Sequence, residues 1–175
     1  MTMTSGLRKL ALTAHVTSSV ALLGSIAAFL ALAVAGLASE DAQMVRAAYP
    51  AMDLIARLVI VPLAFAALLT GLVQSLGTPW GLFRHYWVLV KLLLTILATI
   101  VLLAKIGLIG DAARLAAEPA LSPADLRAAG MELAVHAAAG LLVLFVPVAF
   151  SVYKPRGMTR YGWRKQHEQR TVLMP

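Results

Sequence analysis

Residues 87–109 read WVLVKLLLTILATIVLLAKIGLI, a run of 23 residues in which Lys91 and Lys105 are the only charged side chains. About 20 apolar residues are enough for a helix to cross the hydrocarbon core of a bilayer. Because that core holds no water, every backbone N–H and C=O must be bonded within the segment, which favours an α-helix. The run therefore predicts a membrane-spanning helix.

Three further stretches meet the same criterion, at residues 10–37, 54–76 and 131–153. Each is predominantly apolar without regular alternation, whereas a transmembrane β-strand alternates apolar and polar residues. The first is also longer than the core of a signal peptide, which has about 7–15 residues, so we expect it to remain as a helix. The sequence predicts an all-α protein: a polytopic four-helix membrane bundle over residues 1–153, followed by a basic tail over residues 154–175.

The composition agrees with a protein embedded in the lipid bilayer. Of the 175 residues, 61% are hydrophobic and 13% are charged, whereas a soluble domain has about 45–50% apolar and about 25% charged residues. The absence of cysteine excludes disulfides, thiolate nucleophiles and cysteine-ligated metal centres. A water-soluble enzyme and a disordered chain are excluded as well.

The formal net charge of +7 is unevenly divided between the two ends of the predicted bundle. The end that holds both termini and the turn at residues 77–81 has ten basic residues and one acid, and the other end has five basic and seven acidic residues. Lysine and arginine gather on the cytoplasmic side of membrane proteins. We therefore expect a multi-pass protein with cytoplasmic N and C termini, a tail that lies against anionic lipid, and no nucleic-acid partner.

Polar side chains inside a span are costly, which makes them candidates for function. One set lies toward the predicted cytoplasmic ends of the spans: His15, Ser18, Ser19, Thr70, Gln74, Lys91 and Thr95. A bundle that brings them to one level suits haem b, with histidine on the iron and cationic or hydroxyl groups at the propionates. The candidate cofactor-binding residues are His15, Lys91, Ser19 and Gln74. The alternative is that these groups only join helices by hydrogen bonds.

A second set lies toward the opposite ends of the spans: Asp53, Arg57, Lys105, Glu132 and His136. Asp53 with Arg57 and Glu132 with His136 are spaced i, i+4, which places each pair on one helix face. Together with Lys105 they could form a charge network. A metal site from Glu132, His136 and Asp53 is the alternative, since carboxylate and imidazole suit zinc, iron or copper(II). His136 and Glu132 are thus the second choice of metal ligands, after His15.

The run SLGTPWGLFRHYWVLVKLLL at residues 75–94 resembles a family of small bacterial membrane proteins of unknown function. The resemblance covers nearly the whole chain. It implies a four-helix protein of the bacterial inner membrane and says little about activity.

Three further elements resemble the superfamily that groups copper-resistance D membrane proteins with the haem-dependent protoporphyrinogen oxidases. They are a histidine early in the first helix (His15), an aromatic residue ahead of Lys-Leu-Leu-Leu (Trp87 and residues 91–94), and a helix that ends in Lys154-Pro155. The resemblance implies that His15 ligates haem iron and that Lys91 is its catalytic or supporting partner. Where the oxidases carry an Asn-Glu-x-Pro stretch, this chain has Phe145-Val-Pro147.

The leading hypothesis from the sequence is a membrane protein that binds haem b and acts in redox chemistry or in haem or metal handling. One alternative is a non-enzymatic accessory or assembly subunit of a membrane complex. Besides the lipid bilayer, the expected partners are further copies of the chain or the subunits of a larger membrane complex. Another is the handling of copper or a different metal.

Overall fold

A computed structural model describes residues 3–77, 81–118, 123–153 and 157–165. The helices are α1 (Ser5–Ala38), α2 (Ala42–Ile55), the π-helical turn η1 (Ala56–Ile60), α3 (Val61–Gly77), α4 (Tyr86–Ala117) and α5 (Pro123–Tyr153). Since α2, η1 and α3 follow one another without a break, these described residues form four helical segments long and apolar enough to cross a membrane. The predicted all-α four-helix bundle is confirmed, and the chain is an integral membrane protein that contacts the lipid bilayer.

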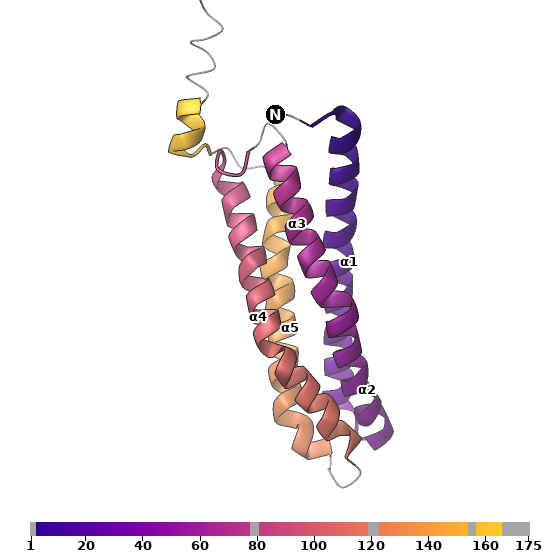
Figure 1. The fold of residues 1–175 in the computed structure, drawn as a ribbon. Coiled ribbons are helices and arrows are strands. Elements are labelled where there is room, and N and C mark those ends of the chain that lie inside the picture. Colours follow the sequence, from indigo (N-terminus) through magenta and orange to yellow (C-terminus); the bar gives the residue numbers. More distant parts are fainter. Residues whose placement is uncertain (1–2, 78–80, 119–122, 154–156, 166–175) are drawn as a thin grey trace, which may run out of the picture.

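The helices run antiparallel in a square bundle (Figure 1). α1 packs beside α3 and α5, and α4 packs beside the same two helices and beside α2. Among the described residues, this leaves α1 and α4 on one diagonal. The N-terminal end of α1 and a short helix at residues 160–165 lie at the same end of the bundle (Figure 1). Which end faces the cytoplasm stays a prediction from the charge distribution.

The second membrane segment begins at Ala42, well before residue 54, where the apolar run suggested its start. The side chain of Asp41 accepts a hydrogen bond from the backbone N–H of Gln43 at 2.9 Å, which caps the helix. Polar residues such as Gln43 and Arg46 then form the exposed side of α2, so a search for continuous apolar residues passes over it. Asp53 and Arg57 therefore lie in the middle of this segment and not at its start.

The π-helical turn η1 accompanies a proline. The backbone N–H of Val61 bonds to the carbonyl of Ala56, five residues back. Pro62, the next residue, has no N–H to offer to a carbonyl four residues back. A local widening of the helix is a common response to such a loss. In α5, by contrast, the helix continues through Pro147.

Beyond the apolar run, which ends at residue 109, α4 continues without interruption as far as Ala117. The Lys154-Pro155 pair, expected at the end of the last helix, lies outside the described residues.

The tightest packing lies around α2. Tyr49 and Met52 are 1% and 0% exposed, and the Tyr49 hydroxyl donates a hydrogen bond to the Leu126 carbonyl of α5 at 3.2 Å. Gly130 of α5 faces the same hydroxyl, and a Cβ at that position would lie 2.3 Å from it. Many large apolar side chains elsewhere are exposed, which is expected where lipid replaces water as the solvent.

We expect Gly130→Ala to lower the free energy of unfolding by about 1–3 kcal/mol, because the added methyl must displace the Tyr49 ring. The measurement is unfolding by sodium dodecyl sulfate from mild-detergent micelles, followed by circular dichroism. Gly107→Ala is the matched control, since a Cβ at Gly107 has no neighbour within 4 Å. Equal stability of the two variants would contradict the packing described for Gly130.

Part of the basic tail packs back onto the start of α4. The backbone N–H of Thr159 donates to the carbonyl of Arg84 at 2.9 Å, and its hydroxyl donates to the carbonyl of Phe83. Thr159 is buried, and its hydroxyl oxygen also accepts the backbone N–H of Gly162 at 3.1 Å. The residues on either side of Thr159 are therefore held against the end of the bundle.

Candidate functional site

His15 is half-buried on the inner face of α1 and meets α3 there. Its Nδ1 lies 3.1 Å from Oγ1 of Thr70. The Thr70 hydroxyl has a single proton, which it donates to the backbone carbonyl of Ala66 at 2.6 Å. We therefore assign the proton to Nδ1 of His15, as the donor to Thr70. In the neutral imidazole this leaves the lone pair of Nε2 available.

A glycine allows this arrangement. A Cβ at Gly71, the residue after Thr70, would lie 3.1 Å from Cε1 of His15. The imidazole thus rests against backbone, with Thr70 as its polar neighbour. Ser18, one turn along α1, is buried and donates its hydroxyl to the carbonyl of His15 at 3.1 Å. The sequence analysis proposed Ser19 as a cofactor-binding residue. In the structure it is Ser18 that bonds to His15.

Gln74 lies one turn from Thr70 on α3, as the sequence predicted. Its Oε1 is buried and has no hydrogen-bond partner among the described residues. A buried acceptor without a donor costs about 1–3 kcal/mol. A water, or a bound molecule with a polar hydrogen, would remove that cost.

Lys91 reaches toward α5. Its Nζ donates to Oγ of Ser151 at 2.8 Å and lies 5.0 Å from the centre of the Trp87 ring, within the range of a cation–π contact. Ser151 in turn donates its proton to the carbonyl of Pro147. His15 and Lys91 stand on diagonal helices, and the described residues show no hydrogen bond between them.

The second set of intramembrane polar residues is divided into two groups. Lys105 on α4 pairs with Glu132 on α5, with Nζ 2.6 Å from Oε1, which is one contact within the predicted charge network. His136 donates from Nδ1 to the backbone carbonyl of Glu132 at 2.7 Å and does not bond to its carboxylate. Asp53 does not join Glu132 or His136. Its carboxylate pairs with Nε of Arg57 at 2.7 Å. Within the described ranges, no group of three or more His, Asp or Glu side chains could hold a metal.

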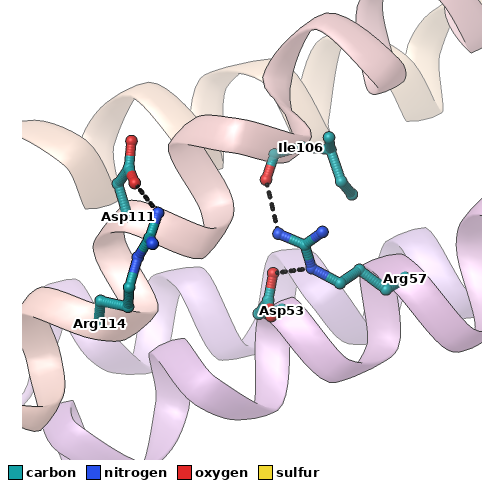
Figure 2. A network of polar contacts seen from close by, with 5 residues as sticks. All are labelled: Asp53, Arg57, Ile106, Asp111 and Arg114. Atoms are coloured by element: carbon teal, nitrogen blue, oxygen red, sulfur yellow. Dashed lines mark hydrogen bonds and ion pairs between the residues drawn. The ribbon is translucent and has the colours of Figure 1, made fainter.

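Arg57 makes a link between helices that the sequence did not reveal. Its Nε bonds to Asp53, and its Nη2 donates to the backbone carbonyl of Ile106 on α4 at 3.3 Å (Figure 2). Gly110 makes room for it, because a Cβ there would lie 2.6 Å from Nη2. The separate Asp111–Arg114 pair lies further along α4 (Figure 2). In the sequence, Arg57 stands inside an apolar run, and its spacing predicted only the i, i+4 pair with Asp53.

A cavity of about 220 Å³ lies deeper in the bundle, between α4 and α5, with α1 and α3 behind it. Its walls are almost entirely apolar, and they include Lys105, His136, Thr95 and Thr99. His15 and Lys91 are not among its lining residues. The sequence predicted two sets of polar residues at opposite ends of the spans. In the structure, several members of the first set form a polar layer around His15, and His136 of the second set lies beside an apolar cavity.

Comparison of the chain with protein-family models, with curated proteins and with solved structures finds no match in any of the three. The chemistry of the side chains around His15 and His136 is therefore what points to a function.

Proposed function

We propose that this integral membrane protein binds haem b through His15 and takes part in membrane redox chemistry or in haem or metal handling. The observation that supports this most directly is the hydrogen bond from Nδ1 of His15 to Thr70, which leaves Nε2 available for a metal. Histidines that ligate metals donate the other ring N–H to an oxygen in this way, which fixes the tautomer and the ring orientation.

The neighbouring residues fit such a group. Gly71 lets the imidazole lie against α3, and Lys91 supplies a positive charge on the opposite side of the bundle. A cation near the bundle end is suited to meet a carboxylate such as a haem propionate. Haem iron would supply one-electron chemistry. The part of the protein is to hold the ligand nitrogen, orient it, and place Lys91 at the carboxylates.

The test is an absorption spectrum of the detergent-purified protein after expression with added haem. We expect a Soret band in the wild-type protein and its loss in His15→Ala, because the alanine has no ligand nitrogen. His136→Ala is the matched control and is expected to keep the band. Absence of the band in the wild type would overturn haem binding, and loss of the band only in His136→Ala would overturn the assignment of His15.

Copper or another metal is a second candidate that the same histidines favour, since a neutral imidazole ligates several transition metals. Elemental analysis of the haem-free protein separates the two. A stoichiometric metal that is lost in His15→Ala, without a Soret band, would favour metal handling over haem. A defined protein that co-purifies with no chromophore and no metal would favour an accessory subunit.

A further inference from the structure

The cavity between α4 and α5 is open toward the lipid. Leu97 and Val101 of α4 line it, and both are also exposed on the outer surface of the bundle, at 54% and 39%. The inner end is closed by Phe29 of α1 and Ala64 of α3, which are buried. A molecule dissolved in the membrane could enter between α4 and α5 without passing through water.

The polar groups in the cavity are mostly hydrogen-bond acceptors whose own protons are already used. The hydroxyl of Thr95 donates to the carbonyl of Lys91, and that of Thr99 donates to the carbonyl of Thr95, each at 2.8 Å. Nδ1 of His136 donates to the carbonyl of Glu132 at 2.7 Å. In the neutral imidazole, Nε2 of His136 is then an acceptor, and it has no hydrogen bond within the described part of the chain.

Among the described residues that line the cavity, Lys105 is the one lysine or arginine, and it does not favour an anion. Nζ of Lys105 lies 2.6 Å from the carboxylate of Glu132, so its charge is already balanced. An anionic ligand would have to compete with Glu132 for Lys105. A purely apolar ligand would leave the acceptors buried without donors, which costs free energy for each of them. The chemistry of the walls therefore favours a neutral hydrophobic molecule that carries a hydroxyl group.

We propose that this cavity binds a neutral hydrophobic phenol or alcohol from the membrane, whose hydroxyl donates to Nε2 of His136 while its carbon skeleton fills the apolar walls. A membrane quinol and a long-chain alcohol share this chemistry. The site is separate from the layer around His15 and does not depend on haem binding.

The test compares para-octylphenol with para-octylanisole, its methyl ether, which has nearly the same shape and no hydroxyl proton. Binding is measured by calorimetry with the wild-type protein in lipid nanodiscs, with protein-free discs subtracted. One hydrogen bond corresponds to about a tenfold difference in affinity, so we expect the phenol to bind about tenfold more tightly than the ether. Equal affinities would overturn the proposal. Dodecanol and a decyl-substituted hydroquinone then show which source of the hydroxyl binds more tightly.

Two variants locate the site. His136→Leu is expected to weaken binding of the phenol to the level of the ether and to leave the ether unchanged. Gly140→Leu is expected to abolish binding of both, because Gly140 lines the cavity and has no neighbour within 4 Å of its Cβ position, so the new side chain would fill the space. Gly107→Leu is the matched control, on the exposed side of α4 with no neighbour within 4 Å.

Wild-type affinity in either His136→Leu or Gly140→Leu would overturn the placement of the ligand. Circular dichroism and elution volume of each variant establish that the bundle is folded. The comparison of phenol and ether in the wild type needs no substitution, so it tests the chemistry even where a variant fails to fold.

Discussion

Tyr49→Ala is expected to lower the free energy of unfolding by about 3–5 kcal/mol, the largest loss of stability that we predict for a single side chain. Tyr49 is 1% exposed, and its ring lies against Gly36 of α1 while its hydroxyl reaches Leu126 of α5. Removal of the ring leaves a cavity where α1, α2 and α5 meet. The surrounding backbone is helical and bonded internally, so it cannot close that space at little cost.

Detergent unfolding of three variants separates the contributions. Tyr49→Phe keeps the ring and loses only the hydrogen bond to Leu126, for which we expect a loss of about 1 kcal/mol. Tyr153→Ala removes a tyrosine that is 83% exposed and is expected to change little. If Tyr49→Ala were no less stable than Tyr153→Ala, the description of α2 as the centre of the packed core would be wrong.

Thr70→Val is expected to weaken haem binding about 10–100-fold, the range usual for loss of a group that orients a metal-ligating histidine. Valine has almost the shape of threonine but cannot accept the hydrogen bond from Nδ1 of His15. The imidazole would then be free to rotate or to change tautomer, and Nε2 would no longer be held available. Titration of the purified apoprotein with haemin, followed at the Soret band, gives the affinity.

Thr99→Val is the matched control, because Thr99 is also buried in a helix and its hydroxyl bonds only to the carbonyl of Thr95. It is expected to leave haem affinity unchanged. If Thr70→Val kept wild-type affinity while His15→Ala lost it, His15 would still be the ligand, but its orientation by Thr70 would be refuted.

The apolar parts of the helices could be predicted from local sequence. The polar start of α2 and the polar end of α4 could not. Residues 87–109 predicted most of α4, but the helix continues to Ala117 because Asp111 and Arg114 pair along one face and do not interrupt it. Likewise, α2 begins at Ala42 because Asp41 caps it and its buried face packs against α1 and α4. Hydropathy detects segments that are apolar all round, whereas these extensions are apolar on one side only.

The candidate site was predicted in part. The i, i+4 spacing correctly placed Thr70 beside Gln74, and it brought Glu132 to the same face as His136. Spacing within one helix carries no information about the neighbouring helix, however. That Thr70 accepts from His15, that Lys91 bonds to Ser151 on α5 and not to the opposite α1, and that Asp53 stays with Arg57 all depend on how the helices are arranged around the bundle.

The sequence by itself determined that this chain crosses the membrane as four helices, because the cost of burying an unpaired peptide group in lipid acts on each segment separately. It also determined which side chains are too polar for lipid. Only the tertiary structure decided that α1 and α4 stand on a diagonal and that the His15 layer and the cavity beside His136 are separate places. Those features depend on side-chain packing between segments distant in the chain, where a glycine such as Gly71 or Gly110 allows one polar group to reach its partner.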